Sequence, residues 1–179
     1  ETDRLHRLIE NILNISRIES GVVKVVREPC SLTAIAKQVL EVVAVQARAK
    51  NLTLNEQLAP VYYQVEGDRD MLYQSILNLV SNAIKYTPEG GTISVSVTAD
   101  ERRQVAVCDV SDTGAGIPPE DLPHIFDKFY RVQANKKLAK GTGLGLTLVK
   151  HIIETVHDGK LSVTSESGKG STFSFILPG

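Results

Sequence analysis

The sequence predicts an α/β (α+β) fold. Helices would cover one face of a mixed sheet in a two-layer sandwich, and a bundle-type helix would precede it. Long segments with helical periodicity, residues 32–50 and 69–86, alternate with short β-branched segments. Several neighbouring strand candidates are joined by tight turns, which favours a mixed sheet over a wholly parallel one. Apolar residues make up 42% of the 179 residues, which is enough for a core.

Residues 1–20 are expected to form a helix with one apolar seam. Leu5, Leu8, Ile12 and Ile15 follow the spacing of a helical bundle, and Gly21 is a suitable stop. So short a helix must pack on a partner. The partner is either the chain's own domain or the other arm of a helical hairpin, and the charged outer faces favour the hairpin.

Capping residues and breakers divide the rest of the chain. Ser31 and Asp68 are N-cap candidates for helices that reach about residues 50 and 86, and Pro29 is expected to end the strand before the first of them. A further helix is expected at residues 144–156. The expected strands are residues 22–27, 52–58, 61–65, 92–98, 104–110, 160–166 and 171–177.

Residues 111–142 show little regular periodicity and contain many glycines, prolines and charges. So long an irregular segment inside a compact domain is typical of a lid. Phe126, Phe129 and Tyr130 would anchor such a lid by apolar contacts, and its glycines would let it move.

The first chemical motif lies on the helix expected at residues 69–86. Asn78 and Asn82 are one turn apart, so their amides share a face, which Lys85 joins. Two amide oxygens and an ammonium group suit a Mg²⁺-bound polyphosphate. Taken alone, this pattern is more typical of a satisfied polar patch on a surface helix.

Two glycine-containing motifs follow. Asp112 precedes Gly114 and Gly116, so the backbone can turn sharply and a carboxylate can accept a hydrogen bond from an exocyclic amine such as that of adenine. An ordinary acidic turn has the same pattern. Residues 141–146, Gly-Thr-Gly-Leu-Gly-Leu, open a helix and would expose backbone N–H groups to phosphate, but they match neither the P-loop nor the dinucleotide-binding spacing.

With these motifs in this order, the chain resembles the catalytic, ATP-binding region of sensor histidine kinases of two-component systems, in the superfamily that includes DNA gyrase and large heat-shock ATPases. Residues 78–86 resemble the N box, 112–116 and 140–146 the two glycine boxes, 125–131 the phenylalanine box and 170–173 the closing motif. Residues 1–21 are similar to the second helix of the dimerisation and phosphoacceptor hairpin. We therefore expect residues 22–179 to form the ATP-binding domain, with a lid at about 117–142.

The resemblance implies roles for individual residues. Asn82 would be the principal Mg²⁺ ligand with Asn78 in support, and Asn82 and Lys85 would be the catalytic pair. Asp112 would bind the adenine amino group, partly with Thr172 through water. The implied nucleotide-binding residues are Asn78, Asn82, Lys85, Tyr86, Asp112, Gly114, Gly116, Ile117, Phe129, Arg131, Gly141, Thr142, Gly143, Leu144, Gly145, Leu146 and Thr172.

Two departures limit the resemblance. Gyrase-like relatives carry a glutamate that activates water at the position of Asn78, and an asparagine cannot act as a general base. We therefore expect slow hydrolysis and transfer of phosphate to a protein histidine. The phosphoacceptor motif, a histidine followed by an acidic residue, has no match here: His6 is followed by Arg7 and reads as a solvated helix residue.

The implied reaction is transfer of the γ-phosphoryl group of Mg·ATP to a hairpin histidine outside this sequence, with relay to an aspartate of a response regulator. The implied parent is a homodimer, and its ATP-binding part would be cytoplasmic. An inner-membrane location would come only from upstream segments, because no apolar run here is long enough to span a bilayer. A net charge of −1 gives no indication of nucleic acid binding. Cys30 and Cys108 are expected to be reduced structural thiols.

Three alternatives remain at this point. A serine kinase of the anti-sigma type shares the fold, although the hairpin-like helix argues against it. A non-catalytic nucleotide-sensing module is disfavoured because Asn82, Lys85 and Asp112 are intact. An unrelated α/β domain would require three concordant motifs to arise by chance.

Overall fold

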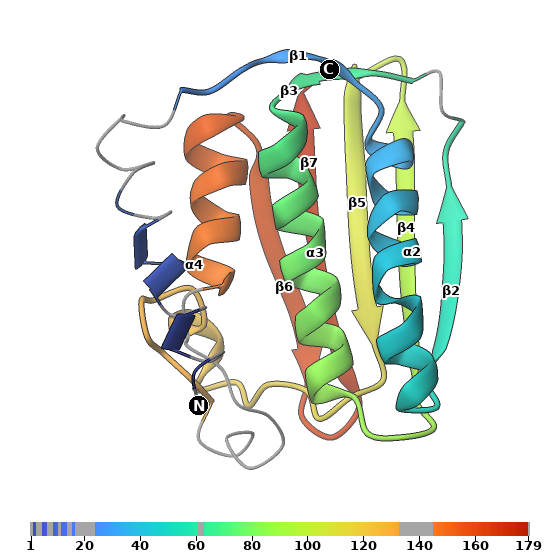
Figure 1. The fold of residues 1–179 in the computed structure, drawn as a ribbon, viewed down its shortest axis with the longest axis vertical. Coiled ribbons are helices and arrows are strands. Elements are labelled where there is room, and N and C mark those ends of the chain that lie inside the picture. Colours follow the sequence, from blue (N-terminus) through green and yellow to red (C-terminus); the bar gives the residue numbers. More distant parts are fainter. Residues whose placement is uncertain are drawn as a thin grey trace.

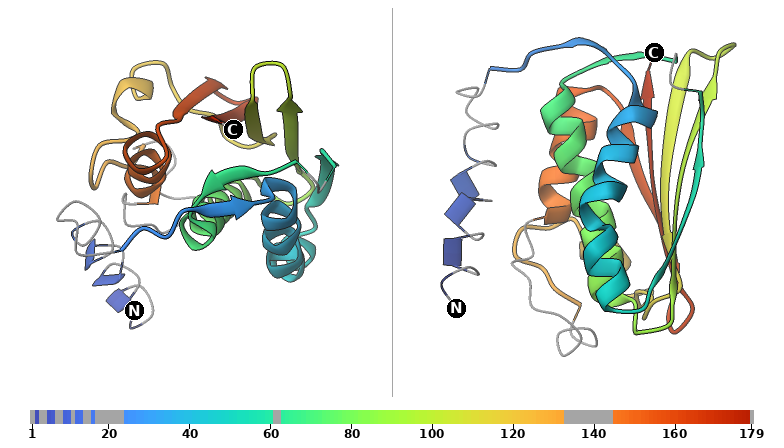
Figure 2. Two further views of the ribbon diagram at one scale, coloured as in Figure 1. Left: turned by 90° about the horizontal axis from the view of Figure 1, so that it is seen from above. Right: turned by 45° about the vertical axis from the view of Figure 1, so that its right-hand side comes forward.

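The computed structural model describes residues 24–60, 63–132 and 145–178, together with residues 2, 5, 6, 9, 10, 12, 13 and 16. Three long helical segments lie on one face of a sheet, as the views in Figures 1 and 2 show. In chain order the elements are β1 (Glu28–Cys30), α2 (Leu32–Ala49), β2 (Thr53–Leu58), β3 (Val65–Gly67), α3 (Arg69–Tyr86), β4 (Thr92–Asp100), β5 (Val105–Asp112), η1 (Leu122–His124), α4 (Gly145–Lys150), η3 (His151–Val156), β6 (Lys160–Glu166) and β7 (Gly170–Pro178).

The main sheet has five strands in the order β2-β4-β5-β7-β6. β2 runs parallel to β4, and every other neighbouring pair is antiparallel. The predicted two-layer sandwich with a mixed sheet is therefore confirmed. The central position of β5 matters for the site, because β5 ends at Asp112 and pairs there with Ser171 of β7.

Both long helices begin at the capping residues that the sequence predicts. The Ser31 side chain accepts a hydrogen bond from Ala34 N, and the Asp68 side chain accepts one from Met71 N. Each cap satisfies a backbone donor that has no partner inside the helix. The helices therefore start where local chemistry dictates, and α3 ends at Tyr86, beside the second chemical motif.

Two predicted strands are displaced in the structure. Residues 24–27 are irregular, and the first strand is β1, which contains Pro29 instead of ending before it. β1 pairs only with β3, in a separate two-stranded sheet, so the missing N–H of proline is tolerated on its open edge. The strand expected at residues 61–65 begins only at Val65, because pairing with β1 and not local pattern sets its position.

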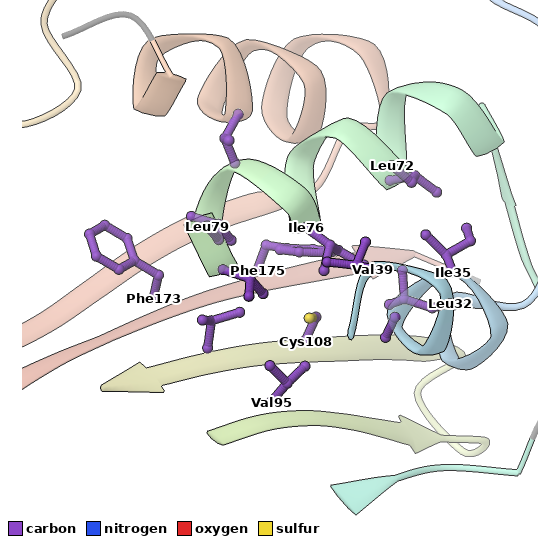
Figure 3. Packing of buried hydrophobic residues seen from close by; sticks show 14 of the residues in the cluster. Leu32, Ile35, Val39, Leu72, Ile76, Leu79, Val95, Cys108, Phe173 and Phe175 are labelled. Carbon is purple, nitrogen blue, oxygen red and sulfur yellow. The ribbon is translucent and has the colours of Figure 1, made fainter. Parts of the chain in front are cut away.

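The core lies between the helical layer and the sheet, as Figure 3 shows. The core residues labelled in Figure 3 are almost fully buried: Leu32, Ile35, Val39, Leu72, Ile76, Leu79, Val95, Cys108, Phe173 and Phe175. Burial raises the pKa of the Cys108 thiol, and both cysteines are free and buried, as predicted. The apolar face of α3 is thereby fixed against the sheet, and its polar residues are left to face elsewhere.

The helix predicted at residues 144–156 changes character partway. α4 is a regular helix, and η3 continues it as a π-helix to Val156. The fully buried His157 follows, and it joins this helix to the start of α3. Its Nε2 accepts a hydrogen bond from Asp68 N at 2.9 Å, and its Nδ1 lies 2.8 Å from Ile152 O.

The eight described residues of the N-terminal segment are all helical. Leu5, Ile9, Ile12 and Leu13 are exposed. Leu8, Ile15 and Gly21 lie outside the described residues, and the division of the chain at residue 21 stays a prediction. None of the helices in the described part of the chain combines the length and apolar character needed to span a bilayer.

Candidate nucleotide-binding site

A pocket lies between α3, the paired ends of β5 and β7, the segment after β5 and the start of α4. From α3 it is lined by Asn78, Ser81, Asn82, Ala83, Lys85 and Tyr86. The other lining residues are Asp112, Gly116, Ile117, Ile125, Tyr130, Arg131, Val132, Gly145, Leu146, Ser171 and Phe173. Three motifs that are far apart in the sequence therefore contribute to one cavity.

The polar side of α3 forms one wall. Asn78 and Asn82 are one helical turn apart, and Lys85 lies almost one turn further on, so all three line the same cavity as predicted. The Nδ2 atom of Asn78 is buried and has no hydrogen-bond partner among the described residues. A buried amide donor without a partner is costly, so it indicates a site completed by a ligand with acceptor atoms.

Asp112 is the acidic group of the site, and its carboxylate is held by backbone donors. Oδ1 accepts a hydrogen bond from Gly114 N at 2.8 Å. Burial raises the pKa of the Asp112 carboxyl above its ordinary value, while backbone hydrogen bonds from Gly114 and Ser171 act in the opposite direction. The result is a fixed, partly desolvated acceptor at the end of a central strand, able to bind an amine of a ligand.

The two glycines after Asp112 have structural tasks. Gly116 lines the pocket with a φ of 71°, in the region that favours glycine, and any Cβ there would overlap the carbonyl of Glu166. Gly114 does not line the pocket. A Cβ on Gly114 would overlap the Tyr86 carbonyl, so this glycine lets the turn pack against the end of α3.

The described part of the predicted lid, residues 117–132, is anchored by aromatic contacts. Phe126 packs edge-on against Phe173, with ring centroids 6.4 Å apart, and Lys150 Nζ lies 5.5 Å from the centre of the Phe126 ring. Phe126 O also accepts a hydrogen bond from Thr147 Oγ1 at 2.8 Å. Of the three predicted aromatic anchors, Phe126 makes these contacts, which attach this segment to α4 and β7.

Phe129 is a predicted nucleotide-binding residue that the structure places outside the pocket. It is 58% exposed and has a φ of 65°. Its neighbour Tyr130 lines the cavity instead, and the Tyr130 hydroxyl donates a hydrogen bond to Asp121 Oδ1. The irregular backbone of the lid decides which aromatic side chain turns inward, and no periodic pattern in the sequence reveals that choice.

Thr172 is also placed away from the pocket, on the sheet face opposite to the helices. Its Oγ1 lies 2.9 Å from Ser111 Oγ, and the pocket is lined by Ser171 and Phe173 on either side of it. Strand alternation explains the difference, because neighbours in a strand point to opposite faces. Phe173 is a core residue, so period two would have identified Ser171 as the inward-facing hydroxyl.

The second glycine motif is described only at its end. Gly145 and Leu146 line the pocket at the start of α4. Gly141, Thr142, Gly143 and Leu144 lie outside the described residues. Their predicted contacts with phosphate therefore stay predictions.

The described residues that line the pocket include both basic and acidic side chains. Lys85 and Arg131 are cationic lining residues, and Asp112 is the acidic one. Apolar residues such as Ile117 and Leu146 also line the cavity. Such a pocket suits a ligand that combines an anionic group, an apolar ring system and an exocyclic amine.

Comparison with known proteins agrees with this geometry. Residues 67–179 match the family of histidine kinase-, DNA gyrase B-, and HSP90-like ATPases. Among curated proteins, the chain is 37% identical to Drug sensory protein A of Synechocystis, over 99% of this chain and 28% of that protein. It is 36% identical to sensor histidine kinase RppB of Synechocystis, over 98% of this chain and 38% of that protein. It is 33% identical to sensor histidine kinase WalK of Bacillus subtilis, over 99% and 29%. The chain thus spans between 28% and 38% of the length of these relatives.

Solved structures show the same fold. Full-length ShkA in complex with AMPPNP superposes with a TM-score of 0.84 at 27% identity, covering 98% of this chain and 36% of ShkA. The histidine kinase ThkA in complex with the response regulator TrrA superposes with a TM-score of 0.79 at 26% identity, covering 99% of this chain and 48% of ThkA.

Proposed function

Because the chain belongs to the family of histidine kinase-, DNA gyrase B-, and HSP90-like ATPases, we propose that it is the catalytic part of a sensor histidine kinase. In this proposal residues 22–179 bind Mg·ATP and present its γ-phosphoryl group to a histidine of a hairpin domain. Residues 1–21 are the second helix of that hairpin. The relatives named sensor histidine kinases and the AMPPNP complex of ShkA support the proposal.

The observation that carries the proposal is the convergence of Asp112 with the polar side of α3 in one cavity. Asp112 accepts a hydrogen bond from the exocyclic amine of adenine, a group that guanine lacks at that edge, while Tyr86 and Ile117 contact the base. Lys85 and Arg131 neutralise the phosphates. All five residues line the pocket. Ser171, whose backbone hydrogen-bonds the Asp112 carboxylate, replaces Thr172 in our proposal as the hydroxyl near the adenine edge.

The residues of α3 fit a magnesium site that is completed by phosphates. Asn82 offers an amide oxygen as the principal ligand, and Asn78 lies one turn earlier in support. The buried Nδ2 of Asn78, a donor with an unmet hydrogen bond, suits a phosphate oxygen. When bound, Mg²⁺ would neutralise charge on the phosphate oxygens. The described residues would contribute positioning: α3 fixes the amides, and Lys85 and Arg131 supply positive charge.

Asn78 also bears on the fate of the phosphate. An amide cannot remove a proton from water at neutral pH, so this position offers no general base for hydrolysis. The phosphoryl group is therefore kept for a protein acceptor. We propose that the acceptor is a hairpin histidine outside residues 1–179, within a homodimeric parent, and that a response regulator receives the phosphate, since ThkA is seen with its regulator TrrA.

His6 lies in the proposed hairpin helix but does not match the phosphoacceptor motif, because Arg7 and not an acidic residue follows it. Its Nε2 lies 3.1 Å from Glu10 on an exposed helical surface. His124 pairs with Asp127 at 3.3 Å, and His157 is buried with both ring nitrogens engaged. We expect none of them to accept phosphate.

Labelled ATP tests this function. The chain alone is incubated with γ-labelled ATP and Mg²⁺, and a second protein carries the same chain joined to the sequence that precedes it in the parent. We expect no label on the chain alone and acid-labile, alkali-stable label on the longer protein. Acid-stable label would point to a serine kinase and contradict the proposal, as would acid-labile label on residues 1–179 alone. Nucleotide binding without any transfer by the longer protein would favour a sensing module.

A further inference from the structure

The last turn of α3 carries Lys85 and Tyr86 to the pocket, and the carbonyl groups of such a turn have no partners within the helix. Lys50 supplies two of the missing donors. Its Nζ lies 2.7 Å from Ile84 O and 3.1 Å from Lys85 O. The next carbonyl, that of Tyr86, accepts a hydrogen bond from Ala115 N at 3.1 Å. Three successive carbonyls at the site are thus held from outside the helix.

Lys50 reaches this position because α2 and α3 lie side by side and finish at the same end of the molecule, as Figures 1 and 2 show. α2 ends at Ala49. Asn51 then adopts a left-handed conformation with a φ of 55°, and Leu52 N donates to Ala47 O at 2.8 Å. This tight chain reversal leaves the half-buried Lys50 side chain directed across to α3.

The same corner is tied to the turn that follows α3. Asn51 Nδ2 donates to Glu89 Oε1 at 2.6 Å, and Gly90 N donates to Asn51 O at 3.2 Å. Thr53 N donates to Gly91 O at 3.0 Å. The α2–β2 corner and the α3–β4 turn therefore form one hydrogen-bonded unit, and Lys50 is its link to the helix itself.

We propose that Lys50 is a positioning residue for the nucleotide site, a role that rests on the proposed function. The carbonyls of Ile84 and Lys85 belong to the two peptide planes on either side of the Lys85 Cα atom. Because peptide units are planar, fixing both carbonyl oxygens fixes the direction in which the Lys85 side chain leaves the backbone. An ammonium group is suited to this task, since a cation at a helix C-terminus also opposes the partial negative charge there.

If Lys50 positions Lys85, its loss should affect some ligands more than others, whereas loss of a purely stabilising cap should affect all ligands of the site alike. Lys85 serves the phosphates, whereas Asp112 on β5 serves the adenine. The Tyr86 carbonyl keeps its own donor from Ala115. Loss of the Lys50 ammonium group should therefore weaken binding of a triphosphate much more than binding of adenosine.

The test compares four proteins: the unaltered chain, Lys50→Met, Lys50→Arg and the control Lys37→Met, which removes an exposed lysine from α2. Calorimetry with AMPPNP and Mg²⁺ and NMR titration with adenosine give the two affinities. For Lys50→Met we expect the Kd of AMPPNP to rise at least fivefold and that of adenosine less than twofold, with the protein still folded. Lys50→Arg should restore most of the AMPPNP affinity, and Lys37→Met should match the unaltered chain.

Hydrogen exchange without nucleotide provides a second measurement. In Lys50→Met, the Lys85 and Tyr86 amides should exchange at least tenfold faster, while amides in the middle of α3 keep their rates. An unchanged AMPPNP affinity, or equal losses for AMPPNP and adenosine, would overturn the proposal. If Lys50→Met does not fold, Lys50→Gln, which keeps a donor of shorter reach, is judged by the same criteria.

The two proposals fail in different ways. If the unaltered chain does not bind AMPPNP, the proposed function fails, and the exchange rates alone decide whether Lys50 orders the last turn of α3. If the unaltered chain binds AMPPNP and Lys50→Met binds it equally well, only the positioning role is overturned.

Discussion

Replacing Asp112 with asparagine is the sharpest perturbation of the proposed adenine contact. Both carboxylate oxygens are hydrogen-bond acceptors. The backbone N–H groups of Gly114 and Ser171 already donate to the carboxylate, and its remaining acceptor positions are left for a ligand. An asparagine has one acceptor oxygen and one donor group of the same size. Whichever way the amide turns, a donor faces either a backbone N–H or the adenine amine, so one donor–donor contact is unavoidable.

The size of the effect follows from the kind of interaction lost. A hydrogen bond to a charged group is worth about 1.5–3 kcal/mol, which corresponds to a rise of about 10- to 150-fold in Kd. Asp112 is partly desolvated, which strengthens its interaction with an amine. The asparagine donor also suits the carbonyl oxygen of guanine, so the preference for ATP over GTP should narrow.

Calorimetry with AMPPNP at pH 7.5 and fixed Mg²⁺ measures the loss, and competition with a GTP analogue measures the specificity. Asp109→Asn is the matched control: Asp109 lies on the same strand, but its carboxylate binds Ser96 and Ser174 instead of lining the pocket. A change of less than threefold in Asp112→Asn, or an equal loss in Asp109→Asn, would refute the assigned adenine contact.

Two further predictions concern the metal and the buried histidine. Asn82→Ala should leave the fold intact and reduce AMPPNP affinity at least tenfold in Mg²⁺ but little in EDTA; calorimetry that finds the same metal dependence as in the unaltered chain would contradict the ligand role. Burial lowers the pKa of His157, whose Nε2 must stay unprotonated to accept from Asp68 N. The unfolded chain therefore binds a proton on His157 more readily than the folded chain does. The contribution of His157 to the free energy of unfolding is complete above about pH 6.5. As the pH falls from there to the lowered pKa, this contribution decreases by up to about 1.4 kcal/mol per pH unit. Urea unfolding should show that the free energy of unfolding declines less between pH 6.5 and 5 in His157→Gln than in the unaltered chain. If the two proteins lose stability in parallel, His157 is not the cause of the decline.

Local signals predicted most of the fold correctly. Ser31 and Asp68 start their helices by capping backbone donors a few residues away, an interaction that depends on adjacent residues alone. The strands expected at residues 92–98 and 104–110 lie within two residues of β4 and β5 at each end. β1 and β3 were misplaced because their limits depend on pairing across a long stretch of chain, Glu28 with Gly67 for example.

The site divides in the same way. Asn78, Asn82 and Lys85 share a face because helical geometry relates them, and Asp112 is recognisable from the glycines that follow it. The sequence by itself therefore determined the chemistry of the pocket: amides, a cation and an acidic acceptor. Helical periodicity brings the amides and Lys85 to one face of α3, whereas the meeting of that face with Asp112 depends on how α3 packs on the sheet.

Only the tertiary structure decided which other side chains complete the pocket. Alternation around the core residue Phe173 indicates that Ser171 and not Thr172 faces inward, but only the register of β7 against β5 places Ser171 beside Asp112. Tyr130 and not Phe129 lines the cavity because the lid backbone is irregular there. Lys50 meets α3 because two helices pack side by side, a contact 34 residues apart in sequence that no local pattern specifies.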